Sequence, residues 1–148
     1  MKSILGRGAG REFERKFASL SFGAMQGPHL TADLRHCAPE KSALTGLHAL
    51  RQLCQDAVAA SGLRAVGELF YPFPAPGGVT GVVLLAESHL TVHPWPELGA
   101  VTLGVLDVYG CNLHGDHSSK AEALMTQLQV AFGAARVELQ RVIRGVGL

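Results

Sequence analysis

The stretch from Gly78 to Glu97, GVTGVVLLAESHLTVHPWPE, holds two strand candidates in direct succession. Val79 to Glu87 is rich in β-branched and aliphatic residues, which is typical of a buried strand. His89 to His93 alternates polar and apolar residues, which is typical of a half-buried strand, and Ser88 lies at the junction. Unpaired imidazole, hydroxyl and carboxylate groups cost free energy inside an apolar core, so their mixture here indicates a chemical role.

Two helix patterns and several further strand patterns surround this stretch. Ser42 is a plausible N-cap for a first amphipathic helix that ends at Gly62. A capping box from Ser119 to Glu122 opens a second amphipathic helix that ends at Gly133. This order of elements predicts an α+β fold, a two-layer α/β sandwich with both helices on one face of a mainly antiparallel sheet. The further strands are expected at residues 30–34, 64–73, 100–109 and 136–143.

Composition bounds the class of protein. The 148 residues suffice for one domain with one core, and 47% of them are hydrophobic while 17% are charged. A formal net charge of +1 argues against nucleic acid as a partner. The apolar runs are too short for a membrane-spanning helix or a signal peptide, so we expect a cytoplasmic protein without a membrane partner. Three cysteines without CxxC spacing, Cys37, Cys54 and Cys111, indicate reduced thiols.

Residues 1–28 are expected to form an N-terminal extension, followed by a single domain of residues 29–148. Three glycines near the start interrupt any regular element. Phe13, Phe17 and Leu20 then recur at i, i+4 and i+7, which predicts one apolar stripe of a short helix. Such a stripe is suited to docking on the body of the protein.

The stretch from Gly78 to Glu97 resembles the signature of the small prokaryotic pyruvoyl-dependent S-adenosylmethionine decarboxylases. That signature is a Gly-Val-Ser-Gly strand, Glu-Ser-His-Leu, and an Ile-His-Thr-Trp-Pro-Glu run, followed by an Asp and a Cys. A looser similarity extends from about Gly27 to Gly145. The resemblance implies a carboxy-lyase of polyamine (spermidine) biosynthesis. Some relatives on this scaffold decarboxylate ornithine or arginine, so those substrates stay open, as does an unprocessed dimeric small-molecule-binding module.

The resemblance also implies that the chain cuts itself between Glu87 and Ser88, giving a β chain of residues 1–87 and an α chain of residues 88–148. The Ser88 hydroxyl attacks the preceding carbonyl and moves the acyl group from nitrogen to oxygen. Removal of the serine α-proton then expels the ester by β-elimination, and the dehydroalanine hydrolyses to a ketone. The cofactor is therefore a covalently bound pyruvoyl group derived from Ser88, which forms a Schiff base with the substrate amine and accepts electrons as carbon dioxide leaves.

Five further positions match residues with roles in that family. His93 corresponds to the processing and catalytic histidine, a group that can act as base or acid. Cys111 corresponds to the cysteine that donates a proton to the decarboxylated carbon, and Glu97 to the glutamate that binds the ribose hydroxyls. Thr80 replaces a serine that assists processing and keeps its hydroxyl. Phe73, or an aromatic neighbour, corresponds to the ring that stacks on adenine.

Strand geometry places a condition on this assignment. Ser88 and His93 are five residues apart, so in a regular strand they face opposite sides of the sheet. Either a bend or bulge turns Ser88 toward His93, or the two meet across subunits. The family's sites lie at a dimer interface, so the resemblance implies a homodimer with an αββα arrangement. The spacing of Cys111, His114 and His117 imitates metal ligands, but a solvated loop explains these residues equally well and we expect no metal.

Overall fold

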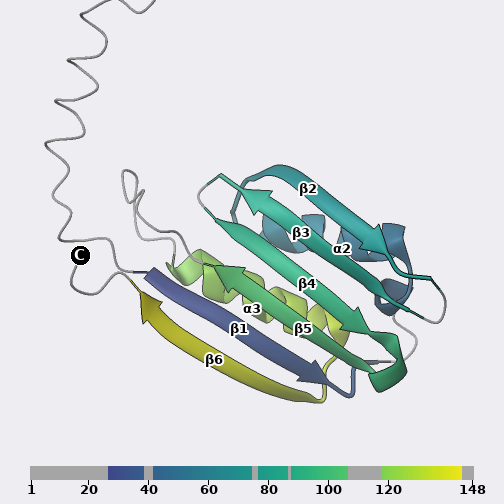
Figure 1. Ribbon diagram of the computed structural model, residues 1–148. Helices are drawn as coiled ribbons and strands as arrows, with labels where there is room; N and C mark the ends of the chain where they lie inside the picture. Colours follow the sequence, from purple (N-terminus) through teal and green to yellow (C-terminus); the bar gives the residue numbers. More distant parts are fainter. Residues whose placement is uncertain (1–26, 39–41, 75–76, 87, 107–117, 145–148) are drawn as a thin grey trace, which may run out of the picture.

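The protein forms a single six-stranded sheet with two α-helices on one face, in a computed structural model that describes residues 27–38, 42–74, 77–86, 88–106 and 118–144 (Figure 1). The strand order is β2-β3-β4-β5-β1-β6, and each of the five neighbouring pairs is antiparallel. The predicted α+β fold, with helices on one face of an antiparallel sheet, is thereby confirmed. The elements are β1 Gly27–Arg35, the 3₁₀ turn η2 Ser42–Leu44, α2 Leu47–Ala60, β2 Ala65–Pro72, β3 Val79–Leu85, β4 His89–Trp95, the 3₁₀ turn η3 Pro96–Leu98, β5 Ala100–Leu106, α3 Ser118–Phe132 and β6 Arg136–Arg144.

The two strands of the central motif bury one face and expose the other. Along β3 and β4, every second side chain is buried, with Val83 and Leu90 fully inaccessible. This is the alternation that the sequence predicts for a sheet covered on one side. β4 runs two residues further than expected and includes Pro94, which lacks a backbone N–H. The strand accommodates Pro94 because the pairing of β3 with β4 has already ended at Gly81 and Val92.

The helices begin at other residues than the caps we predicted. Ser42 starts a 3₁₀ turn, and the residue that caps α2 is Gly46, whose backbone is extended. The prediction of Ser42 as the N-cap of α2 was wrong. The chain first forms the 3₁₀ turn and then becomes extended at Gly46 before α2 begins, and the sequence pattern around Ser42 does not show this interruption. α3 begins at Ser118, so Ser119 lies within its first turn. Both helices end where predicted, since Gly62 and Gly133 adopt left-handed φ values of 73° and 61°.

The hydrophobic core lies between the sheet and the helices. α2 packs mainly on β2 and β3, and α3 packs mainly on β1 and β5 (Figure 1). Phe132, Leu50, Leu128 and the other central side chains are fully buried there. The opposite face of the sheet, called the open face below, carries no element of the described chain (Figure 1). None of the helices that the structure describes is long and apolar enough to cross a membrane.

Candidate functional site

Ser88 closes a tight turn between β3 and β4. The Leu85 N–H donates to the Ser88 carbonyl over 2.8 Å, and the Ser88 N–H donates back to the Leu85 carbonyl over 3.3 Å. These reciprocal bonds define a hairpin with a loop of only two residues, at positions 86 and 87. The bond that the sequence predicts to be cut therefore lies within this turn. Glu87 itself lies outside the described residues.

The hydroxyl of Ser88 is buried and points to the helix side of the sheet. Directly opposed residues share a face, and its partner Leu85 is 5% exposed in the core. The Ser88 Oγ has no hydrogen-bond partner among the residues that the structure describes. Such an atom is uncommon, because a buried polar group without a partner costs about 1–3 kcal/mol.

A concave site lies at the other end of the same two strands. A cavity of about 280 Å³ opens where β3 begins and β4 ends. Its backbone floor is close-packed, because a Cβ on Gly78 would lie 2.7 Å from the Pro94 carbonyl oxygen. Three residues predicted from the sequence, Phe73, His93 and Glu97, meet in this cavity. Its other lining residues are Gly77, Gly78, Pro94 and Trp95.

Aromatic rings form a continuous row along this cavity. His93 stacks on Trp95 with ring centroids 4.3 Å apart, and it lies 5.8 Å from Phe73 on its other side. Tyr71 continues the row by an edge contact with Phe73 at 5.5 Å. The His93 Nδ1 is buried and has no hydrogen-bond partner within the described ranges. The row lines the cavity with aromatic ring surface, and the buried Nδ1 keeps a hydrogen-bonding capacity that no described residue uses.

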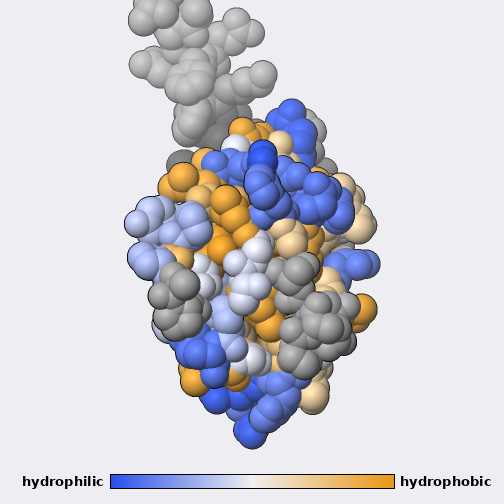
Figure 2. All heavy atoms as spheres, turned by 90° about the vertical axis from the view of Figure 1, so that its right-hand side faces the viewer, coloured by the Kyte–Doolittle hydropathy of each residue, from blue (hydrophilic) through white to orange (hydrophobic). Residues whose placement is uncertain are grey.

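Trp95 is the pocket residue to which the sequence reasoning gave no role. The available signal was its position between two prolines, two residues after His93 and hence on the same face of β4. The surface at this end of the molecule carries hydrophobic residues among hydrophilic ones (Figure 2). Trp95 is 39% exposed and Leu98, in the next turn, is 69% exposed.

Thr80 belongs to the same end of the hairpin as His93. Gly81 is paired with Val92, so one step further along the register Thr80 stands opposite His93. Thr80 and His93 are both half-buried on the open face. The structure therefore groups Thr80 with His93, Phe73 and Glu97, and separates this group from Ser88.

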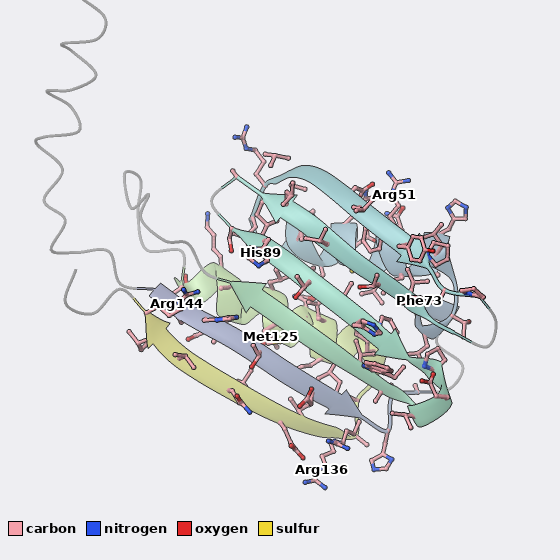
Figure 3. All side chains as sticks on the ribbon, viewed as in Figure 1. Arg51, Phe73, His89, Met125, Arg136 and Arg144 are labelled. Atoms are coloured by element: carbon pink, nitrogen blue, oxygen red, sulfur yellow. The ribbon has the colours of Figure 1, made fainter. Side chains whose placement is uncertain are left out.

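The separation of Ser88 from His93 is large. Five residues of strand span about 16 Å, and the two side chains face opposite sides of the sheet. The four described pairs of β3 with β4 keep one register, without a bulge that would turn Ser88 around. Figure 3 shows His89, the neighbour of Ser88, and Phe73 at opposite ends of the strands. One chain thus holds the two halves of the predicted site apart.

Basic groups gather at the Ser88 end of the open face. His89 and His29 are both paired with Leu106, so they lie two strands apart in one row. Figure 3 shows Arg144 at the same end of the sheet. Burial, followed by the charges of Arg144 and His89, lowers the pKa of His29. This favours a neutral imidazole at His29.

The cysteines divide into two classes. Cys37 and Cys54 lie in the hydrophobic core as free thiols. Burial raises the pKa of Cys37, and burial with the nearby Glu68 charge raises the pKa of Cys54 to about 12. Both therefore stay protonated at neutral pH, and their burial in the core keeps them away from the cavity. Cys111, the predicted proton donor, lies outside the described residues, as do His114 and His117.

Within the part of the chain that the structure describes, no group of three or more His, Cys, Asp or Glu side chains is arranged to hold a metal ion.

The sequence matches the S-adenosylmethionine decarboxylase family over residues 28–145. The chain is 37% identical over 121 residues to the S-adenosylmethionine decarboxylase proenzyme of Symbiobacterium thermophilum, covering 82% of this chain and 84% of that protein. It is 38% identical over 120 residues to the proenzyme of Aquifex aeolicus, covering 81% and 82%. The crystal structure of adenosylmethionine decarboxylase from Aquifex aeolicus superposes with a TM-score of 0.67 at 33% identity, covering 84% of this chain and 92% of that one. By this match in sequence and in fold, the chain belongs to the S-adenosylmethionine decarboxylase family.

Proposed function

We propose that the protein is a self-processing decarboxylase that converts S-adenosylmethionine to its decarboxylated form and carbon dioxide. One observation carries the proposal beyond family membership. Phe73, His93 and Glu97, matched to the family by the sequence alone, line one cavity although 24 residues separate the first from the last. The named relatives favour S-adenosylmethionine over ornithine or arginine as the substrate.

The cavity suits one part of that substrate. The ring row of Phe73, His93 and Trp95 provides faces on which an adenine can stack. Glu97 is exposed at the rim, where its carboxylate can accept hydrogen bonds from two ribose hydroxyls. The side-chain cation of ornithine or arginine could pair with Glu97, but neither amino acid has a ring that would stack on the aromatic row. The arrangement therefore supports a nucleoside-containing substrate.

Ser88 fits the role of precursor to a pyruvoyl group. Its Oγ is buried and unpartnered among the described residues, and its backbone nitrogen lies in a two-residue turn. When formed, the pyruvoyl group supplies a carbonyl that accepts the electron pair left by the departing carboxylate. Glu87 would then end the β chain. The residues of the cavity would bind and orient the substrate, with the His93 imidazole available to move a proton.

We propose further that each complete site combines two copies of the chain. About 16 Å of strand separates Ser88 from His93 within one copy. A two-fold axis running across the strands, with the open faces stacked about 10 Å apart, would place the Ser88 end of one copy over the cavity of the other. Residue 88 points to the helix side in the intact turn, but once it begins the α chain the turn would no longer hold it there. The open face suits this, because Leu69 and Tyr71 are 69% and 58% exposed there and Leu84 is 51% exposed. The result is the αββα homodimer that the resemblance implies.

The domain limits and the location complete the proposal. Residues 29–148 form the decarboxylase domain, and residues 1–28 an extension whose last two residues, Gly27 and Pro28, already belong to β1. The protein acts in the cytoplasm, where free thiols such as those of Cys37 and Cys54 persist.

Intact mass spectrometry of the purified protein tests the self-processing. We expect an 87-residue and a 61-residue fragment, with a ketone at the start of the second. Ser88→Ala should give one 15.6 kDa chain, whereas the control Ser119→Ala, on the exposed side of α3, should be cleaved like the wild type. Cleavage of the Ser88→Ala protein at the same bond would reject the assignment. An uncleaved wild type would instead support the small-molecule-binding module.

A decarboxylation panel tests the substrate. Release of carbon dioxide from S-adenosylmethionine, ornithine and arginine is measured in parallel on the cleaved protein. We expect turnover of S-adenosylmethionine and a KM for it that rises in Phe73→Leu and Glu97→Gln. Turnover of only ornithine or arginine would show that S-adenosylmethionine is not the substrate, but it would not contradict the self-processing.

A further inference from the structure

We propose that the segment Arg11–Phe22 of the N-terminal extension forms a third helix, which docks on the helix side of β6 beside α3. The docking surface consists of Val137, Leu139 and Ile143 and is called the β6 apolar face below. The inference is independent of the decarboxylase activity. It rests on two observations: α2 and α3 leave the helix side of β6 uncovered, and the extension joins the sheet at Gly27, beside the end of β6.

The β6 apolar face lies on the same side of the sheet as the helices. Val137 is paired with Leu34 and Leu139 with Ala32, and both partners are buried under α3. Paired residues of an antiparallel sheet share a face, so Val137 and Leu139 point to the helix layer as well. All nine residues of β6 are nevertheless exposed. Val137, Leu139 and Ile143 keep 36%, 53% and 48% of their surface accessible.

The width of the sheet explains why this face is uncovered. Six strands spaced about 4.8 Å apart are wider than two helices spaced about 10 Å apart can cover. α2 lies over β2 and β3, and α3 lies over β1 and β5, so β6 extends past the helix layer (Figure 1). Arg141 also lies on this side of β6, between Leu139 and Ile143, and its ion pair with Glu122 at 2.8 Å draws its side chain toward α3. Beyond α3 there is room for one more helix.

The attachment point of the extension favours it as the occupant. Gly27, its first described residue, is paired with Arg144 at the end of β6 (Figure 3 shows Arg144 there). The extension thus enters the sheet on the strand next to β6, at the end where the β6 apolar face begins. Residues 22–26 span at most about 17 Å when extended, which is enough to rise from the sheet into the helix layer. A tethered segment also meets the face at high effective concentration.

The sequence of the extension matches the face in length and pattern. Phe13, Phe17 and Leu20 recur at i, i+4 and i+7, as one stripe of a helix. The stripe is about 10 Å long, and Leu139 and Ile143 are about 13 Å apart along the strand. A helix that runs back toward Gly27 would place Leu20 near Ile143 and Phe13 near Leu139. Arg11 and Arg15 would then face solvent on the opposite side of the helix.

Photo-crosslinking of the full chain tests the contact. A benzophenone amino acid in place of Phe17 should crosslink to the peptide of residues 136–144, and one in place of Arg15 should not. Mixing ¹⁵N-labelled and unlabelled protein before irradiation shows whether the joined peptides come from one chain. Leu139→Ser with Ile143→Ser should abolish the crosslink, whereas Val142→Ser, on the open face of the same strand, should leave it unchanged. Crosslinks to other peptides, or only between chains, would overturn the proposal.

Hydrogen exchange provides a second readout without a probe. β6 is an edge strand, so its backbone amides should exchange fast when nothing covers them. Packing of the helix against β6 should slow this exchange. The full-chain variant Phe13→Ser/Phe17→Ser/Leu20→Ser should exchange roughly tenfold faster over residues 136–144. The matched variant Arg11→Ser/Arg15→Ser/Ala18→Ser, on the opposite side of the predicted helix, should exchange like the wild type. Equal exchange in all three proteins would contradict the docking.

Discussion

The imidazole of His93 stacks on the indole of Trp95, with ring centroids 4.3 Å apart and ring planes 21° apart. Phe73 borders the imidazole on its other side, at 5.8 Å. The orientation of His93 is therefore set by two neighbouring rings, while its Nδ1 has no partner among the described residues. A change at Trp95 should alter how His93 meets a ligand.

Replacing Trp95 by leucine removes the ring under His93 but keeps an apolar side chain. Because an aromatic pair contributes about 0.5–1.5 kcal/mol beyond its buried area, we expect the KM for S-adenosylmethionine to rise roughly two- to tenfold. Self-cleavage should still go to completion. Steady-state kinetics measure the change, with Leu98→Ala as a control because Leu98 is exposed nearby but does not line the cavity. An unchanged KM in Trp95→Leu would remove Trp95 from substrate binding.

In the proposed homodimer, the Thr80 hydroxyl of one copy should contribute to self-processing at Ser88 of the other. Thr80 stands opposite His93 on the open face, so Thr80→Ser keeps the group in place whereas Thr80→Val replaces it by a methyl of similar size. We expect Thr80→Ser to be cleaved at the wild-type rate and Thr80→Val at least about tenfold more slowly, the effect of losing one proton-transfer or hydrogen-bonding group. Gel electrophoresis of freshly translated protein follows the cleavage. Equal rates for the two variants would show that the hydroxyl is not used.

Thiol labelling should separate the three cysteines. Burial raises the pKa of Cys37, and burial with the Glu68 charge raises that of Cys54 to about 12, so neither forms a thiolate at pH 8 in the folded protein. We expect both to react with a disulfide reagent only after unfolding. Any fast-reacting thiol of the native protein should disappear in Cys111→Ala. Rapid labelling of Cys54 in the native protein, located by peptide mapping, would contradict the burial seen here.

Gly81 should tolerate no side chain. A Cβ at this position would lie 2.4 Å from the ring of Phe70, which packs against the core. We expect Gly81→Ala to lower the free energy of unfolding by about 1–3 kcal/mol, as other overpacked sites do. Gly67→Ala is the matched control, because its Cβ would meet Leu84 at an ordinary 3.5 Å and should change stability by less than about 0.5 kcal/mol. Denaturant unfolding in the uncleaved Ser88→Ala background measures both, and equal stabilities would refute the clash.

His29 should make stability depend on pH. Its pKa is lowered in the folded protein by burial, by Arg144 and by His89, so the unfolded chain binds the proton more tightly. The stability present above the ordinary imidazole pKa of about 6.5 is therefore lost as the pH falls through the lower, folded pKa. We expect His29→Gln to be less sensitive than wild type to a change from pH 8 to pH 5. Denaturant unfolding of both proteins at the two pH values measures this, and parallel losses would exclude His29 as the cause.

The sequence by itself determined most of the secondary structure and the family to which the chain belongs. Alternation along Val79–Leu85 and His89–Trp95 specified two strands and the side of each that is buried, because side chains alternate with a period of two in any strand. The motif around Ser88 predicted His93 and Glu97 as site residues, and the resemblance predicted Phe73 or an aromatic neighbour beside them; the cavity is lined by all three.

Only the tertiary structure decided how these residues are distributed in space. The register of β3 with β4 places Ser88 and His93 on opposite faces and at opposite ends of one hairpin, and pairing register is a property of two strands rather than of one. The position of Trp95 under His93 likewise depends on the turn that follows β4. Val137 and Leu139 are exposed because a sheet of six strands is wider than two helices can cover. A local sequence pattern does not show how many strands the helices have to cover.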